Sequence, residues 1–235
     1  MYQMKLRCFV IAFSLLIVTN INAQMSTGFI RGGANLAHVT ATNLDVKPVI
    51  SFQFGFIGNV PITPNIAFQP GLIFTGKGTK SQSGNTSDGT YYQATSNPYY
   101  VEILTNLVFK TGSAGYTRFF AGAGPYLGIG VAGKVKNIGK LMGSPFQNEK
   151  AIEWSNDDPS TLNNEGGGGF GIMKRFDYGL NATAGIETLY AVISANYGFG
   201  LAPLQNVTNS SADDKSKHRV LSLTVGIRLG ALRWE

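Results

Sequence analysis

Five charged side chains recur in segments of this sequence that are otherwise apolar, small or amide-bearing. They are three arginines and two glutamates: Arg31, Glu102, Arg118, Glu187 and Arg228. Each falls on the less apolar of two alternating faces. If that face is enclosed, an unpaired charge is costly, whereas opposite charges can form ion pairs. The set therefore predicts an interior charge network.

The sequence contains two histidines, His38 and His218, which limits acid-base and metal chemistry. They stand near the outer ends of the first and last alternating segments, which become neighbours if those segments close a barrel. The two imidazoles could then meet at the rim, with Asp213 or Asp214 nearby. Two solvated side chains are the simpler interpretation, because a metal site needs a ligand geometry that spacing does not show.

Other motif-like patterns lack the context that their chemistry requires. Residues 71–77 read Gly-Leu-Ile-Phe-Thr-Gly-Lys, but Gly78 stands where a phosphate-binding loop needs Ser or Thr. The glycine runs 122–130 and 166–171 lack the strand-loop-helix setting of a dinucleotide fold. Two acidic pairs lack the ligand spacing of an EF-hand loop: Asp157-Asp158 and Asp213-Asp214. We therefore predict no catalytic, cofactor-binding or metal-ligating residue.

The first residues have the order of a secretory signal. Lys5 and Arg7 precede an apolar run, 9–18, and a small residue follows at Ala23. The run is about half of the roughly 20 residues that a membrane-spanning helix needs. We therefore expect a signal peptide over 1–23, cleaved after Ala23, and a β-barrel domain over 24–235.

Composition excludes several functional classes. The one cysteine, Cys8, lies inside the expected signal peptide, so the mature chain has no thiol chemistry. Loss of Lys5 and Arg7 lowers the formal charge from +6 to +4, which is too mild to indicate nucleic-acid binding. No later apolar stretch is long enough for a membrane helix, so a membrane would have to be crossed by strands.

Period-2 alternation predicts eight strands along the mature chain. We place them at 28–38, 52–60, 66–74, 99–109, 120–131, 178–187, 191–201 and 221–229. Short connections, at 61–65, 111–115 and 187–190, alternate with long polar ones, at 39–49, 78–98, 132–174 and 202–217. This order predicts an all-β fold: an up-and-down antiparallel transmembrane β-barrel of about eight strands, with short periplasmic turns and long extracellular loops.

The chemistry of the faces separates a membrane barrel from a soluble one. A soluble barrel would enclose its apolar side chains, whereas here the polar faces carry glycines, amides and isolated charges that suit a filled lumen. Phe120 and Tyr126 are expected to point inward and cover glycine backbone. Aromatic residues near strand ends suit the interfacial girdles of such barrels: Tyr99, Phe109, Tyr116, Phe176, Tyr178, Tyr190 and Phe199.

Four short motifs carry a resemblance to a known family. They are Gly32-Gly33-Ala34-Asn35-Leu36, Phe68-Gln69-Pro70-Gly71-Leu72, Arg175-Phe176-Asp177-Tyr178-Gly179-Leu180 and Ser222-Leu223-Thr224-Val225-Gly226-Ile227-Arg228-Leu229. Over nearly the whole mature chain the sequence resembles the PorT-type outer-membrane β-barrel family of Gram-negative bacteria. The resemblance implies a fold and an outer-membrane location, without a shared activity. One departure is that the last alternating run ends at Leu229, whereas many such barrels finish on an aromatic residue.

We expect a non-enzymatic integral protein of the bacterial outer membrane, with a side-chain-filled lumen and external loops for partner contact or envelope organisation. A narrow channel for ions or small solutes is the first alternative. A lipid-modifying enzyme at the rim is the second, with His38 or His218 as its base. Expected partners are outer-membrane lipid and the barrel assembly machinery. A protein or small-molecule ligand at the loops stays open, and neither a cofactor nor nucleic acid is expected.

Overall fold

The computed structural model describes residues 27–40, 45–84, 90–112, 116–141, 143–155, 171–205 and 216–229. The expected signal peptide, with its cleavage site at Ala23, lies outside the described residues, as do both acidic pairs. The strands are β1 (Thr27–Thr40), β2 (Asp45–Pro61), β3 (Ile66–Gly76), β4 (Thr79–Ser83), β5 (Tyr91–Lys110), β6 (Arg118–Leu141), β7 (Ser144–Ala151), β8 (Glu153–Trp154), β9 (Ile172–Met173), β10 (Phe176–Glu187), β11 (Ala191–Gly200) and β12 (Lys217–Leu229).

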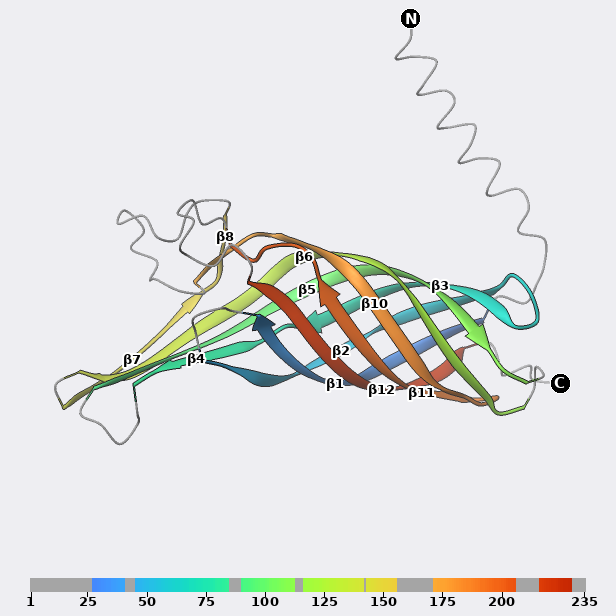
Figure 1. Cartoon of the computed structure of the whole chain (residues 1–235), viewed down its shortest axis with the longest axis horizontal. Helices are drawn as coiled ribbons and strands as arrows, with labels where there is room; N and C mark the ends of the chain where they lie inside the picture. The colour runs from blue at the N-terminus through green and yellow to red at the C-terminus, as the bar shows by residue number, and fades with distance from the viewer. Residues whose placement is uncertain are drawn as a thin grey trace, which may run out of the picture.

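Eight of these strands close into an antiparallel barrel (Figure 1). The ring runs β1, β2, β3, β5, β6, β10, β11, β12, and β12 pairs back onto β1 from Gly28 opposite Leu229 to Thr40 opposite Lys217. Strand β4 continues the line of β3 after Lys77 and Gly78, and pairs with β2 and β5. The predicted eight-stranded, up-and-down architecture is confirmed.

Connections of different length lie at the two ends of the barrel. The short ones, after β2, β5 and β10, share one end with the start of β1 and the end of β12 (Figure 1). The opposite end carries the long connection between β6 and β10, which includes β7, β8 and β9. Since short turns are periplasmic in such barrels, this second end is the extracellular one.

Strands extend further into three of the four predicted long connections than the sequence indicated. β1 and β2 extend to Thr40 and from Asp45, β4 and the first half of β5 occupy most of 78–98, and β6 continues to Leu141 before β7. Beyond the lipid layer both faces of a strand can be wet, so apolar alternation fades while backbone pairing continues. Polar composition was therefore mistaken for loop.

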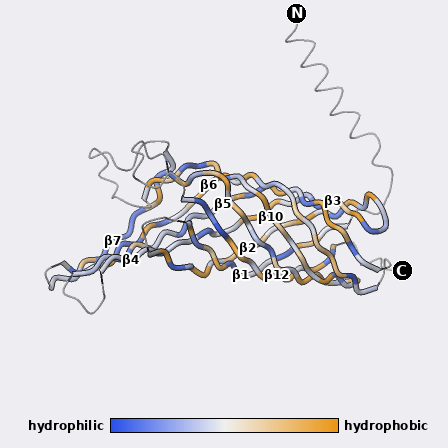
Figure 2. The backbone as a smooth tube through the Cα atoms, viewed as in Figure 1, coloured by the Kyte–Doolittle hydropathy of each residue, from blue (hydrophilic) through white to orange (hydrophobic). Residues whose placement is uncertain are grey.

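Apolar side chains cover the outside of the barrel, and polar ones fill the inside. Along the barrel strands, hydrophobic and hydrophilic residues follow one another in alternating patches (Figure 2). Exposed residues include Ile30, Leu36, Phe54, Leu72, Ile103, Leu127, Leu180, Ile193, Leu223, Val225 and Ile227. Buried, inward residues include Arg31, Asn35, Gln53, Gln69, Glu102, Asn106, Asn181, Asn196, Ser222 and Thr224. A soluble barrel has the reverse arrangement, so this is the distribution of a transmembrane barrel. In the described part of the chain no helix is long and apolar enough to span a membrane.

Two aromatic rings lie inside the barrel against glycine backbone, as predicted. Phe120 and Tyr126 are buried. A Cβ atom added to Gly185 would lie 2.9 Å from Cζ of Phe120, and one added to Gly179 would lie 2.8 Å from Cε1 of Tyr126. Glycine at these two positions therefore makes room for the rings.

The outward placement of Leu223 predicts a large cost for a charge there. Leu223 lies mid-strand in β12, is 61% exposed, and pairs with Ala34 and Ala195 on its two neighbours. Leu223→Arg is expected to destabilise the barrel by about 2–4 kcal/mol, because the guanidinium would face the hydrocarbon core. Urea unfolding in lipid vesicles measures this. Tyr190→Arg, at the turn after β10, is the control, with an expected cost of about 0–1 kcal/mol at the interface; equal costs would contradict the assigned faces.

Candidate functional site

An ion cluster lies in the extracellular half of the lumen. Lys77 follows β3, and its Nζ contacts Oε1 of Glu102 and lies 2.5 Å from Oδ2 of Asp177. The hydroxyl of Tyr126 donates to the same Asp177 oxygen at 3.2 Å. The Lys77 ammonium also lies 4.3 Å from the centre of the Tyr126 ring and 5.3 Å from that of Tyr100. One cation from the β3–β4 junction thus joins carboxylates from β5 and β10.

Arg31 and His218 flank this cluster without an ion pair of their own in the described chain. Arg31 Nη1 donates to Oδ1 of Asn196 at 3.3 Å. His218 Nε2 lies 3.3 Å from the Tyr100 hydroxyl, and the two rings meet edge to face. The charges of this half balance, since Arg31 and Lys77 face Glu102 and Asp177.

The two histidines do not meet, which corrects the rim-site hypothesis. In the β1–β12 register, Val39 lies opposite His218 and His38 lies opposite Arg219. Directly opposed residues share a face and successive residues alternate, so His38 and His218 point to opposite sides of the barrel wall. Asp213 and Asp214, suggested as their neighbours, lie outside the described residues.

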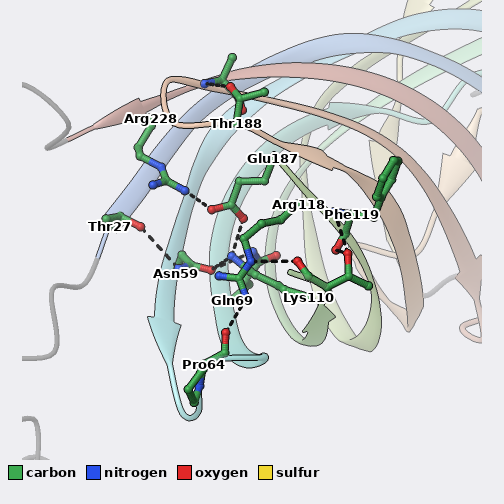
Figure 3. Close-up of polar contacts among 12 residues, drawn as sticks. Thr27, Asn59, Pro64, Gln69, Lys110, Arg118, Phe119, Glu187, Thr188 and Arg228 are labelled. Atoms are coloured by element: carbon green, nitrogen blue, oxygen red, sulfur yellow. Dashed lines mark hydrogen bonds and ion pairs between the residues drawn. The ribbon is translucent and has the colours of Figure 1, made fainter. Parts of the chain in front are cut away.

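A second ion cluster lies at the periplasmic end, drawn in Figure 3. Glu187, at the end of β10, lies between two cations: its Oε2 is 2.5 Å from Nζ of Lys110, and its Oε1 contacts Nη2 of Arg228. The Lys110 ammonium also donates to Oδ1 of Asn59 at 2.7 Å, and Gln69 donates to the same oxygen at 3.1 Å. Contacts between these side chains therefore join five strands of the ring: β2, β3, β5, β10 and β12.

Arg118, at the start of β6, completes this end without contacting a carboxylate of the described chain. Its guanidinium donates to the backbone carbonyls of Thr111, at 3.2 Å, and Pro64, at 2.5 Å, in two periplasmic turns. A cavity of about 240 Å³ opens beside it, lined by Lys110, Arg118, Glu187 and Arg228 among others. Three cations therefore face one carboxylate at the periplasmic mouth.

The structure divides the five charges predicted as one network. Arg31 and Glu102 lie in the extracellular half, and Arg118, Glu187 and Arg228 at the periplasmic end. All five point inward. Sequence reasoning missed Lys77, Lys110 and Asp177, which take part in three of the buried ion pairs of the described chain. Lys110 lies an even number of residues from Glu102, and Asp177 from Glu187, so the alternation already indicated that both point inward. Lys77 belongs to residues 71–77, which were considered only as a possible phosphate-binding loop.

Apolar side chains separate the clusters and close the lumen. Phe29, Ile57, Ile73, Leu104, Val108, Phe120, Tyr126 and Val192 form one buried group with Ala67. The void beside Arg31, Lys77 and Glu102 is about 30 Å³, which is room for roughly two water molecules. The described lumen is therefore packed, not open.

The extracellular mouth is covered by a second apolar group. Val39, Val135, Ile152, Met173 and Leu204 pack together with Trp154. β8 and β9, which supply Trp154 and Met173, pair in parallel. The Trp154 ring meets the Tyr100 ring edge to face, with centres 5.5 Å apart. This cap joins the connection between β6 and β10 to the barrel below it.

The polar side chains of the described lumen are engaged in packing and charge pairing. The buried His218 has Tyr100 as its ring partner. Among the described residues, no group of three or more His, Cys, Asp or Glu side chains is placed to hold a metal ion.

A closed eight-stranded barrel with an apolar exterior and a filled polar lumen defines a class, the small transmembrane β-barrels of bacterial outer membranes. Residues 20–206 match the family described as outer membrane protein beta-barrel domain, and the chain belongs to this family. It is accordingly an integral protein of the bacterial outer membrane. No curated protein matches the sequence.

Several solved structures are similar to this chain at low identity. The attachment invasion locus protein Ail of Yersinia pestis is 14% identical, with 87% of this chain and 99% of that chain covered and a TM-score of 0.41. Neisserial surface protein A is 12% identical, with 86% and 96% covered and a TM-score of 0.38. The N-terminal β-barrel domain of Pseudomonas aeruginosa OprF is 13% identical, with 88% and 98% covered and a TM-score of 0.35.

Proposed function

We propose that this protein is a non-enzymatic, non-conducting outer-membrane anchor that presents a β-sheet outside the cell for partner contact or envelope organisation. One observation carries the proposal: side chains occupy the lumen from the periplasmic ion cluster, through the apolar group around Leu104 and Phe120, to the cap under Trp154. A barrel of eight strands encloses little more than its own side chains. Conduction would require several of these contacts to break together.

The described part of the chain that is offered to the outside is a sheet. Beyond the barrel wall, the start of β2, β4, the first half of β5, the end of β6 and β7 continue as paired strands, here called the extension (Figure 1). Every residue of β7 is exposed. β7 pairs with β6 through Lys134 to Leu141. Ordered strands hold their side chains in fixed rows, which suits recognition of an extended partner surface.

Further expectations about this chain belong to the same proposal. We place it among PorT-type barrels on the motifs around Asn35, Gln69, Asp177 and Thr224. Its export would follow signal-peptide cleavage after Ala23, and the barrel assembly machinery and outer-membrane lipid would be its first partners. A ligand at the extension is expected to be a protein or small molecule and not nucleic acid.

Single-channel recording in planar bilayers tests the closed lumen. The folded protein is expected to give no conductance steps above the protein-free bilayer, because the ion clusters and the apolar group leave no continuous path. The triple variant Leu104→Ala, Phe120→Ala and Tyr126→Ala removes side chains from that group and serves as a control that should conduct. Steps from the unmodified protein that vanish on changing Glu102 or Arg118 would instead establish a narrow channel.

A further inference from the structure

The outward face of the extension carries a row of lysines set by strand register. Lys47 of β2 lies opposite Lys80 of β4, which lies opposite Thr95 of β5. Thr95 in turn lies opposite Lys136 of β6. Directly opposed residues in antiparallel strands share a face, so these three lysines project from one side of the sheet. Lys134 and Lys140 stand on the same side of β6, because residues two apart share a face.

This lysine face, defined as Lys47, Lys80, Lys134, Lys136 and Lys140, is the outer side of the extension. Residues of the opposite side are buried toward the mouth, among them Thr79, Ala94, Ser96 and Val135. Val135 belongs to the apolar cap. The lysines therefore point away from the barrel axis, in the direction that the apolar residues face lower down the same strands.

The row is unfavourable for the fold in isolation. Lys47 and Lys80 are directly opposed like charges on neighbouring strands, a pairing that destabilises a sheet. Lys136 lies two strands from Lys80, about 10 Å away at the usual strand spacing, close to the screening length in physiological salt. A sheet face built for stability alone would alternate the signs of these positions.

Acidic residues compensate only part of this charge. Glu149 of β7 lies 2.7 Å from Nζ of Lys134, and this ion pair holds the pKa of Glu149 below its ordinary value. Asp45 starts β2 in register with Gln82, at the far edge of the sheet. In the described strands of the extension these are the acidic residues, against the five lysines of the face and Lys150 on the other side.

The lysine face rises directly from the lipid-facing surface. The rings of Phe52 and Phe54, which are exposed, and of Phe74 and Tyr99, which are half-buried, stack on one another at the outer end of the apolar belt. Tyr99 directly follows the part of β5 that belongs to the extension. Asn97, two residues earlier, lies opposite Lys134, and Thr95 lies opposite Lys136. At the rise of a β-strand, the two rows stand about 7 and 13 Å beyond the aromatic level. Because the strands of such barrels tilt by about 35–45°, these distances correspond to about 5 and 10 Å in height. The headgroup layer is about 5–7 Å thick on each side of the core, so the first row lies within it and the second just beyond it, within reach of a flexible lysine side chain.

We propose that the lysine face binds phosphate groups of anionic lipids in the outer leaflet of the outer membrane. Charge complementarity and continuity with the apolar belt carry the assignment, and the ammonium groups act as compact cations for phosphate. The inference rests on the proposed function, which places the extension outside the cell. Bound phosphate would relieve the repulsion between Lys47 and Lys80, so lipid and sheet would stabilise each other.

Mass spectrometry of lipid retained by the folded, full-length protein tests this. The protein in neutral detergent is mixed with a bisphosphorylated glycolipid, lipid A, or with its phosphate-free form. The phosphorylated lipid should be retained selectively, and retention should fall as salt rises. The triple variant Lys47→Gln, Lys80→Gln and Lys136→Gln should weaken retention by roughly 100-fold, because each basic residue near an anionic lipid surface contributes about fivefold.

A control variant, Lys150→Gln with Lys174→Gln, removes lysine charges that are not part of the lysine face and should retain lipid like the unmodified protein. Circular dichroism checks that both variants fold. Equal loss in both variants, or equal retention of phosphate-free lipid, would overturn the proposal. Competition by soluble polyphosphate without selectivity for the lipid would reassign the face to free polyanions and overturn the lipid assignment. Bilayer conductance is independent of these results, so failure here is distinguishable from failure of the proposed function.

Discussion

Replacing Glu187 by alanine is expected to destabilise the barrel by about 3–5 kcal/mol, because it breaks a buried ion pair by removing one partner. Glu187 is 4% exposed and is the carboxylate that both Lys110 and Arg228 contact. Its loss leaves these two cations beside Arg118 with no acidic partner among the described residues of that end. Urea unfolding in lipid vesicles, followed by tryptophan fluorescence, measures the change.

The exposed ion pair of the extension supplies the control for Glu187. Glu149→Ala breaks the contact with Lys134, whose side chain is 73% exposed, and should leave the urea midpoint unchanged because water solvates both groups. A Glu187→Ala variant as stable as Glu149→Ala would show that the periplasmic cluster is solvated like a surface. The double variant Glu187→Gln with Lys110→Met should recover part of the lost stability, since it removes one negative and one positive charge together.

Lys77→Met is expected to cost a similar amount, about 3–5 kcal/mol, because it leaves two carboxylates buried together without their cation. Glu102 and Asp177 come from β5 and β10 and both contact the Lys77 ammonium. Glu102→Ala should cost less than Lys77→Met, since Lys77 keeps Asp177. The same unfolding measurement ranks the two variants.

Removing the repulsion as well as the cation separates charge from packing at this site. The triple variant Lys77→Met, Glu102→Gln and Asp177→Asn should be substantially more stable than Lys77→Met alone, because a neutral, packed replacement of a buried ion cluster is often tolerated. A triple variant no more stable than the single one would mean that shape, and not charge, makes Lys77 important. Outer-membrane assembly in cells gives a second readout of the same ranking.

The ring of strands was predictable because successive residues of a membrane strand face lipid and the polar lumen in turn, which gives the sequence a period of two. Leu223 and Ile227 had to face lipid, and Thr224 and Arg228 had to face the lumen, so the order of residues alone assigned each face. Beyond the lipid layer this constraint disappears, and the strands that continue through Thr95 and Lys136 read as polar loop. The strand register that aligns Lys47 with Lys80 is a property of pairing between distant segments, which no single segment encodes.

The interior charges were predictable as a set but not as partners. The alternation along each strand places Glu102 and Glu187 inside the barrel. Their positions along the barrel axis decide which cations they contact. Strand tilt and register put Arg228 beside Glu187, on a strand two places around the ring, and set Arg31 in the other half. Lys77 was not predicted as an interior residue because Gly76 and Gly78 interrupt the alternation around it. The opposite faces of His38 and His218 also follow from register, which fixes the parity of paired residues.

Polar contacts that cross the lumen also make barrel closure cooperative. Lys77 and Asp177 belong to segments separated around the ring by β5 and β6, and Asn35 of β1 donates to Thr75 of β3 at 2.8 Å across β2. Arg228, on β12, contacts its carboxylate on β10. A partly assembled sheet therefore holds unsatisfied charges that only the final β1–β12 seam encloses with their partners. The polar contacts of the lumen thus stabilise the closed barrel relative to an open intermediate in the membrane.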